Sequence, residues 1–204
     1  MKIAEKQNTI THLIGAAFAL SCIWAIWPAS RISWQMTMSV VLFIGGMFLM
    51  FLSSSIYHWL PIGEAKKAVR KFDHISIYVM IASSYTPICI GVIGGWIGWT
   101  VFSLLWLATI GGAFYKIYCI GKYPRLSLGI YLTMGWCGVL MIKPAIEMLS
   151  TPTMICLLVE GLAYTFGTYF YAHNKHNYYH TIWHIFVLIG ALAHWGAVLF
   201  ILFG

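Results

Sequence analysis

Charged residues are scarce in this chain. Only 8% of its 204 residues are Asp, Glu, Lys or Arg, and five of these are acidic, whereas 61% of the residues are apolar. A soluble domain of this length needs far more charge to cover its surface. The composition therefore excludes an ordinary soluble protein and predicts an all-α integral membrane protein.

Paired cysteines, linkers and low-complexity tracts are also missing. The five cysteines form no CxxC pair and lie mostly within apolar runs. They are expected to pack as small apolar residues, and no disulfide framework is implied. Because no change of composition divides the chain, we expect a single membrane domain over residues 1–204.

Apolar runs, in contrast, are abundant and reach the roughly 20 residues that cross a bilayer core of about 30 Å. Breaks marked by proline, glycine or charge separate seven of them, among them the basic stretch GEAKKAVRK and the polar stretch HNKHN with His173 and His176. The first run could be a signal peptide, but its apolar part is long and further spans follow at once. The predicted spans are Thr9–Trp27, Trp34–His58, Phe72–Val92, Gly95–Tyr115, Leu126–Ile142, Thr153–Tyr171 and Tyr178–Phe203.

Loop charges predict the orientation of this seven-helix bundle. A cytoplasmic N-terminus and an outside C-terminus leave only Arg31 and Lys143 outside, and six or eight spans would scramble this bias. The net charge of +7 then indicates contact with anionic lipids and no nucleic acid partner. The basic residues expected inside are Lys2, Lys6, Lys66, Lys67, Arg70, Lys71, Lys116, Lys122, Arg125 and Lys175.

Several ionisable residues fall at one depth, and such residues within spans are functional-site candidates. His180 and His184 stand one helical turn apart in HTIWH, so both rings lie on one face, as a shared metal ion requires. In the predicted orientation, His58 ends the second span and Asp73 begins the third on the same cytoplasmic side. His12 lies in the first turns of the first span. Three imidazoles and a carboxylate at one level predict a metal site.

The chemistry of these residues suits Zn²⁺. Catalytic zinc sites commonly use three protein ligands and leave a fourth position for water. His58, His180 and His184 would supply the three nitrogens, and Asp73 would act as general base. Ser54, one turn before His58 on the same helix face, would support the carboxylate or the substrate carbonyl.

Taken one at a time, these residues have a simpler explanation. A histidine within a turn of the interface can reach headgroup water, and Asp73 can pair with Lys71 or Arg70. Taken together, these residues favour a metal site, because the count of loop charges, which does not use the histidines, places them all at the same depth in the membrane. In the outer half of the membrane, Glu160 and His194 are predicted to pair.

At these positions the chain resembles the hemolysin III-like bacterial membrane proteins, relatives of the progestin and adipoQ (adiponectin) receptors. Four ordered segments, which span nearly the whole chain, carry the likeness. They are an E-x-x-N-x-x-x-H opening at Glu5, Asn8 and His12, SSSIYHWLP with Ser54 and His58, KFDHISIY with Asp73 and His74, and HTIWHIFVLIGALAH with His180, His184 and His194.

The resemblance implies a seven-helix, multi-pass protein of the bacterial inner membrane that holds zinc near its cytoplasmic face. The wider superfamily includes alkaline ceramidases, which hydrolyse a lipid amide, so membrane lipids and a lipid or acyl-chain substrate are the expected partners. The implied zinc ligands are His58, His180 and His184, with Asp73 and Ser54 linked through water and with Glu5, Asn8, His12, His74 and His194 as supporting residues.

Three functions fit these features. The first is a zinc-dependent hydrolase of a lipid amide or ester. The second is a non-catalytic lipid sensor or regulator of membrane homeostasis with structural zinc. The third is a hemolysin-type cytolysin or pore, which is the least favoured because no span carries a repeated polar-faced stripe and nothing resembles a soluble pro-toxin.

Overall fold

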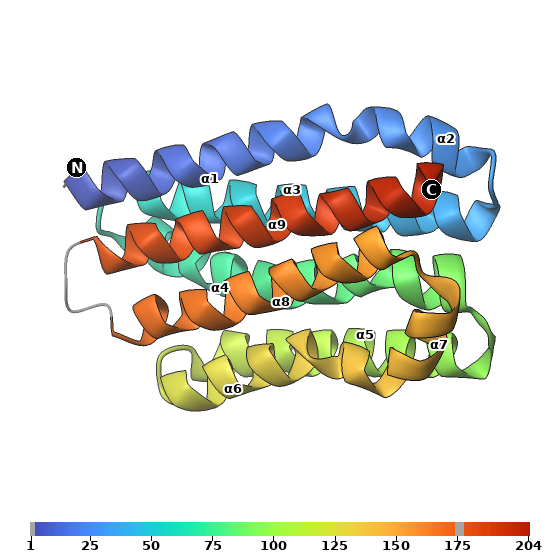
Figure 1. Cartoon of the computed structure of the whole chain (residues 1–204). Coiled ribbons are helices and arrows are strands. Elements are labelled where there is room, and N and C mark those ends of the chain that lie inside the picture. Colours follow the sequence, from blue (N-terminus) through green and yellow to red (C-terminus); the bar gives the residue numbers. More distant parts are fainter. Residues whose placement is uncertain (1–2, 174–177) are drawn as a thin grey trace.

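The computed structural model describes residues 3–173 and 178–204, and no β-strand occurs among them. Seven helical segments long and apolar enough to cross a membrane run side by side (Figure 1), which confirms the all-α, seven-span prediction. His173 is exposed after the sixth span, as expected for a connection, whereas Lys2, Lys175 and His176 lie outside the described residues. The segments are Ile3–Ser30, Trp34–Trp59, Glu64–Ile93, Gly95–Cys119, Pro124–Met148, Thr151–Ala172 and Tyr179–Phe203.

Three of these segments change helix type along their length. The third becomes π-helical at Pro87, because proline has no N–H to continue the α-helical ladder. The first and fifth, predicted as continuous spans, are interrupted by 3-10 turns. The elements are α1 (Ile3–Ser21), η1 (Ile23–Ala25), α2 (Ile26–Ser30), α3 (Trp34–Trp59), α4 (Glu64–Thr86), η2 (Pro87–Ile93), α5 (Gly95–Cys119), α6 (Pro124–Gly135), η3 (Cys137–Met141), α7 (Ile142–Met148), α8 (Thr151–Ala172) and α9 (Tyr179–Phe203).

The predicted span limits leave the GEAKKAVRK stretch, Lys116 and Glu147 in loops, and the structure places them largely or wholly in helices. The GEAKKAVRK stretch is largely helical because α4 begins at Glu64, so Asp73 lies in its third turn. Glu147 lies within α7, and Lys116 lies within α5, where it is buried. Glu, Ala, Lys and Arg are good helix formers, so a helix continues through them beyond the apolar core.

Local chemistry explains where the helices begin. The Ser33 hydroxyl accepts a hydrogen bond from the Met36 N–H at 3.0 Å and caps α3. Ser150 caps α8 in the same way, and Pro152 occupies its first turn.

One residue, Gly94, separates η2 from α5, and its φ of 58° is a left-handed conformation that favours glycine. The almost loop-free division predicted between the third and fourth spans is thereby confirmed.

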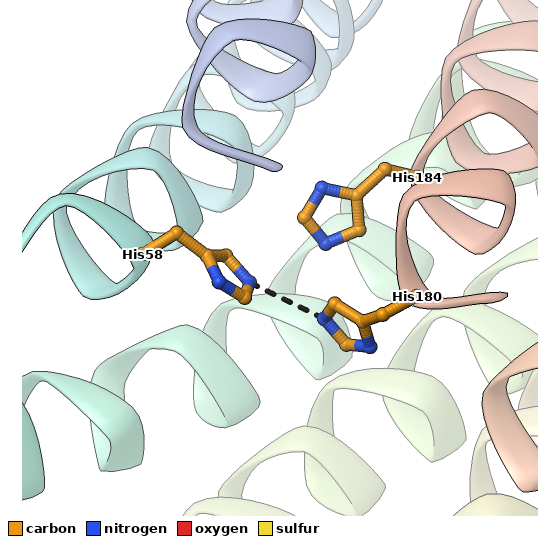
Figure 2. A group of neighbouring side chains, drawn as sticks. All are labelled: His58, His180 and His184. Atoms are coloured by element: carbon orange, nitrogen blue, oxygen red, sulfur yellow. Dashed lines mark hydrogen bonds between the residues drawn. The ribbon is translucent and has the colours of Figure 1, made fainter. Parts of the chain in front are cut away.

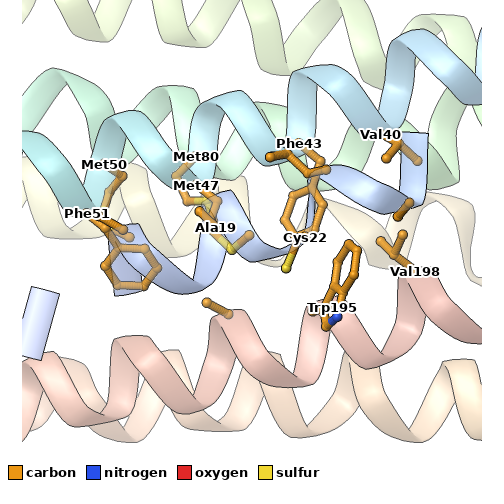
Figure 3. Close-up of a cluster of buried hydrophobic side chains, with 14 of the residues drawn as sticks. Ala19, Cys22, Val40, Phe43, Met47, Met50, Phe51, Met80, Trp195 and Val198 are labelled. Atoms are coloured by element: carbon orange, nitrogen blue, oxygen red, sulfur yellow. The ribbon is translucent and has the colours of Figure 1, made fainter. Parts of the chain in front are cut away.

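The first, second and last spans pack around one apolar cluster (Figure 3). Ala19, Phe43 and Val198 are fully buried there, from α1, α3 and α9 respectively. Helices in lipid associate through close van der Waals packing, which small residues permit. A Cβ on Gly15 would lie 2.5 Å from the Phe51 ring, so α1 and α3 are in direct contact at this glycine.

Chain direction determines which residues meet. The first residues of α1, α4 and α9 and the last residues of α3, α5 and α8 share one end of the bundle, on the left in Figure 1. We call this the histidine end, because His58 lies in the last turn of α3 and His180 and His184 lie in the first two turns of α9. The N-terminus lies at this end and the C-terminus at the opposite one.

Candidate metal centre

Three histidines converge between α3 and α9 at the histidine end. One candidate ligand atom from each of His58, His180 and His184 lies within 4.8 Å of the others. The Nε2 atoms of His58 and His180 are 3.2 Å apart, and Figure 2 shows the three rings around a common space. Zn–N bonds of about 2.0–2.1 Å in a tetrahedron separate ligand nitrogens by about 3.3 Å. Modest ring movements therefore suffice for this group to hold a metal ion.

A carboxylate from the first helix orients one of these rings. His58 Nδ1 lies 2.9 Å from Glu5 Oε2, so its N–H donates to the carboxylate and Nε2 remains as the free lone pair. Lys66 Nζ lies 3.3 Å from the same Glu5 oxygen and 3.2 Å from the Leu60 carbonyl oxygen. This is the arrangement that metal-binding histidines commonly have, with the other ring nitrogen bonded to an acceptor.

The remainder of the E-x-x-N-x-x-x-H opening packs against His184. The Nδ1 atom of His184 lies 3.3 Å from the Asn8 carbonyl oxygen and 3.2 Å from the Thr11 hydroxyl, which leaves Nε2 toward the other two rings. His12 stacks on His184 with ring centroids 3.6 Å apart. Thr181 donates to the Asn8 side-chain oxygen at 2.6 Å. The motif therefore positions α9 and its histidine.

Asp73 and Ser54 lie together but outside the three-histidine group. The Asp73 carboxylate is beside the Ser54 hydroxyl, and within the described chain it forms no ion pair with Arg70 or Lys71. Both Asp73 and Ser54 line a cavity of about 300 Å³. His12 lines the same cavity, so this polar part of the wall borders the histidine group.

His74 takes no part in this group. Its backbone carbonyl accepts a hydrogen bond from the Tyr131 hydroxyl at 2.8 Å, which ties α4 to α6. His194, from the last resemblance segment, lies farther along α9, where its Nδ1 is 2.7 Å from Glu160 Oε2. The predicted pairing of Glu160 with His194 is confirmed.

A buried lysine expected in a loop contributes to the electrostatics of the Asp73 region. Lys116 is 3% exposed and donates to the Ser127 hydroxyl. Its Nζ lies 5.3 Å from the centroid of the Tyr131 ring, and its charge acts on Asp73. In the segment GAFYKIYC, apolar residues continue after the lysine, and this pattern indicates that the helix extends past Lys116.

The fold and the site define a class: seven-span membrane proteins with a largely buried three-histidine group at one end of the bundle. Comparison with known proteins identifies the group within this class. The chain matches the family described as "Haemolysin-III related" over residues 2–195 and belongs to it.

Two bacterial relatives cover nearly the whole chain. It is 35% identical to the Hemolysin-3 homolog of Bacillus subtilis (strain 168), over 96% of this chain and 93% of that protein. It is 32% identical to Hemolysin-3 of Bacillus cereus, over 96% and 90%. The human Monocyte to macrophage differentiation factor, a distant relative from the progestin and adipoQ receptor family, is 28% identical over 75% of this chain and 66% of its own. The protein is a multi-pass protein of the bacterial inner membrane.

Proposed function

We propose that this protein is a zinc-dependent membrane hydrolase of a lipid amide or ester, with its metal site near the cytoplasmic face. The observation that carries the proposal is the meeting of two features: a group of three histidine nitrogens and the carboxylate-lined wall of a cavity inside the bundle. The excess of basic residues at the histidine end supports its cytoplasmic position.

The donor set suits zinc. Imidazole nitrogens are common zinc ligands, and His58, His180 and His184 would hold the ion. Glu5 at His58 and Asn8 at His184 occupy the ring nitrogens that face away from the group, as expected around a metal site. When bound, zinc would supply Lewis acidity, which polarises a substrate carbonyl and makes water more acidic.

The residues on the cavity wall would carry the proton transfers. Asp73 takes a proton from water as the water oxygen bonds to the carbonyl carbon, and returns it to the leaving nitrogen or oxygen as that bond breaks. Ser54, beside Asp73, donates a hydrogen bond that holds the carboxylate or the carbonyl oxygen.

The rest of the cavity suits a lipid chain. Apolar side chains such as Ile81 form most of its wall, which is typical of sites that enclose apolar ligands. Val139, Ile142 and Leu158 line it while remaining 60%, 48% and 54% exposed on the outer surface of the bundle. These three residues lie on η3, α7 and α8, and their exposure supports lateral entry from the bilayer between these elements.

Metal analysis and two variants test the proposal. Detergent-purified protein, prepared without chelators, is expected to contain about one zinc per chain, and His184→Ala is expected to lose it. Asp73→Asn is expected to keep the zinc and the unfolding temperature but to lose hydrolysis of a fluorogenic lipid amide or ester. Glu64→Gln, which neutralises an exposed acid on the same helix, is the matched control and should retain both.

Other outcomes would favour the alternatives. Metal-free protein that is unaffected by His184→Ala contradicts a metal site. If His58→Ala lowers thermal stability while Asp73→Asn preserves function in cells, the zinc is structural and the protein is a sensor or regulator. Reproducible single-channel conductance of the pure protein in planar bilayers would indicate a pore.

A further inference from the structure

The cavity contains a second polar group, away from the histidine end. Glu160 on α8 and His194 on α9 both line it, as does Tyr164, one turn after Glu160 on the same helix. His194 is only 2% exposed. Apolar residues such as Met80 and Val187 line the wall as well.

The hydrogen bonds of this group are incomplete in a specific way. His194 Nδ1 donates to the Glu160 carboxylate at 2.7 Å, so its Nε2 carries a lone pair that can accept a hydrogen bond. Within the described chain, neither this Nε2 nor the Tyr164 hydroxyl has a hydrogen-bond partner, although both atoms are buried. Buried polar atoms are nearly always paired. An unpaired acceptor and an unpaired donor, carried by two residues that line one cavity, therefore indicate a ligand that supplies the opposite pair.

We propose that Glu160, Tyr164 and His194 form a distal polar site that binds a hydroxyl group on the chain of the lipid in the cavity. A hydroxyl can donate one hydrogen bond and accept another. Its O–H donates to His194 Nε2, and its oxygen accepts from the Tyr164 hydroxyl. A plain hydrocarbon chain leaves both protein groups unpaired. The inference rests on the proposed function only in assigning the cavity to a lipid chain, and it does not require hydrolysis.

The position of the distal polar site specifies where the hydroxyl lies on the chain. His184 and His194 are ten residues apart on α9, which corresponds to about 15 Å at 1.5 Å per residue. An extended chain advances roughly 1.2 Å per bond, so the hydroxyl lies about 12 bonds from a head group held at the histidine end. A hydroxyl next to the carbonyl would not reach.

Packing holds both rings in place. The Phe43 ring lies against His194 with centroids 4.6 Å apart. A Cβ on Gly190 would lie 2.5 Å from the Tyr164 ring, so the tyrosine rests directly on the backbone of α9. A simple tie between α8 and α9 would need only the Glu160–His194 bond. A binding site also needs polar atoms that are held in place and available to a ligand, and the Tyr164 hydroxyl and His194 Nε2 are two such atoms.

A pair of matched fatty acids tests the site. Octadecanoic acid and 12-hydroxyoctadecanoic acid each displace a fluorescent fatty acid from the detergent-purified full-length protein. The hydroxy acid is expected to bind about tenfold more tightly, the ratio that one net buried hydrogen bond supports. The 2-hydroxy isomer should show no such preference, because its hydroxyl lies beside the carboxylate.

Variants assign the preference to named atoms. Tyr164→Phe removes one oxygen and is expected to abolish the preference without changing the affinity for octadecanoic acid, and His194→Phe should do the same. Thr168→Val is the matched control, since Thr168 lines the cavity from α8 but its hydroxyl already donates to the Thr165 carbonyl at 2.7 Å. This variant should keep the preference.

The outcomes are distinguishable from those of the proposed function. Equal affinities of the wild-type protein for octadecanoic and 12-hydroxyoctadecanoic acid would overturn the distal site, since its atoms would then bind only water. A preference that survives Tyr164→Phe would also overturn it. If His194→Phe does not fold, Tyr164→Phe still decides the question. His58→Ala should lose zinc and hydrolysis but retain the chain preference, so the two proposals can fail separately.

Discussion

Replacing Glu5 tests whether a carboxylate on the first helix controls the proposed metal ligand His58 on the second span. Glu5 Oε2 accepts hydrogen bonds from His58 Nδ1 at 2.9 Å and from Lys66 Nζ at 3.3 Å. In Glu5→Ala the His58 ring loses the acceptor that determines its tautomer and orientation. We therefore expect zinc affinity to fall, and to fall less in Glu5→Gln, which keeps an acceptor oxygen.

The expected loss follows from the surroundings of Glu5. Residues that hydrogen-bond to metal-bound histidines typically contribute 10–100-fold in metal affinity, which corresponds to about 1.4–2.7 kcal/mol. The Glu5 side chain is 34% exposed, so water can replace part of the lost interaction. We expect a value near the lower limit, about tenfold, and a change in unfolding free energy below about 1 kcal/mol.

The assay is competition for zinc between metal-stripped, detergent-purified protein and a chromophoric chelator. Glu64→Ala is the matched control, because Glu64 is an exposed acid at the start of α4 that pairs with Lys67 at 2.7 Å. Its removal changes the net charge equally and should leave zinc affinity unchanged. Wild-type affinity in Glu5→Ala would refute the reasoning. An equal loss in both variants would also refute it, since net charge would then explain the effect.

Further variants test the packing of α5 and the hydrogen bond of its buried lysine. In Gly112→Ala the new Cβ would lie 2.7 Å from the fully buried Tyr78 ring, and we expect a loss of about 1–3 kcal/mol in thermal unfolding. Gly111→Ala, whose Cβ would meet nothing within 4 Å, is the control and should not destabilise. Ser127→Ala removes an acceptor from the buried Lys116 ammonium and should lower stability by about 1–3 kcal/mol. An unchanged unfolding temperature in Ser127→Ala would show that Lys116 does not depend on this hydroxyl.

Hydropathy predicted the number and order of the spans because the bilayer core demands a long apolar run with internal backbone hydrogen bonds. It did not predict where the helices end. The third span begins at Glu64, eight residues before the expected Phe72, because helix formation outside the hydrocarbon core depends on helix propensity and on contacts with neighbouring helices. The same limit explains why the predicted fourth span stops at Tyr115 and excludes Lys116, whereas α5 continues to Cys119.

The candidate site was predictable to the level of helix faces and depth. The HTIWH spacing places His180 and His184 on one face of a helix, and loop charges place His58 at the same end of the bundle. The rotation of each helix about its own axis was not predictable, because it depends on side-chain packing such as the Gly15–Phe51 contact. That rotation decides that Glu5 meets His58.

Assembly of the metal centre has a consequence for biosynthesis. His58 precedes His180 by 122 residues. At about 5–20 residues per second, the second span is complete roughly 6–24 s before the first histidine of the last span is synthesised. During that interval Glu5 is already available to hold the His58 imidazole. If the three histidines hold zinc as proposed, the complete ligand set forms only after α9 is made, and a chain truncated before α9 would insert most of its helices yet lack two of the three ligands.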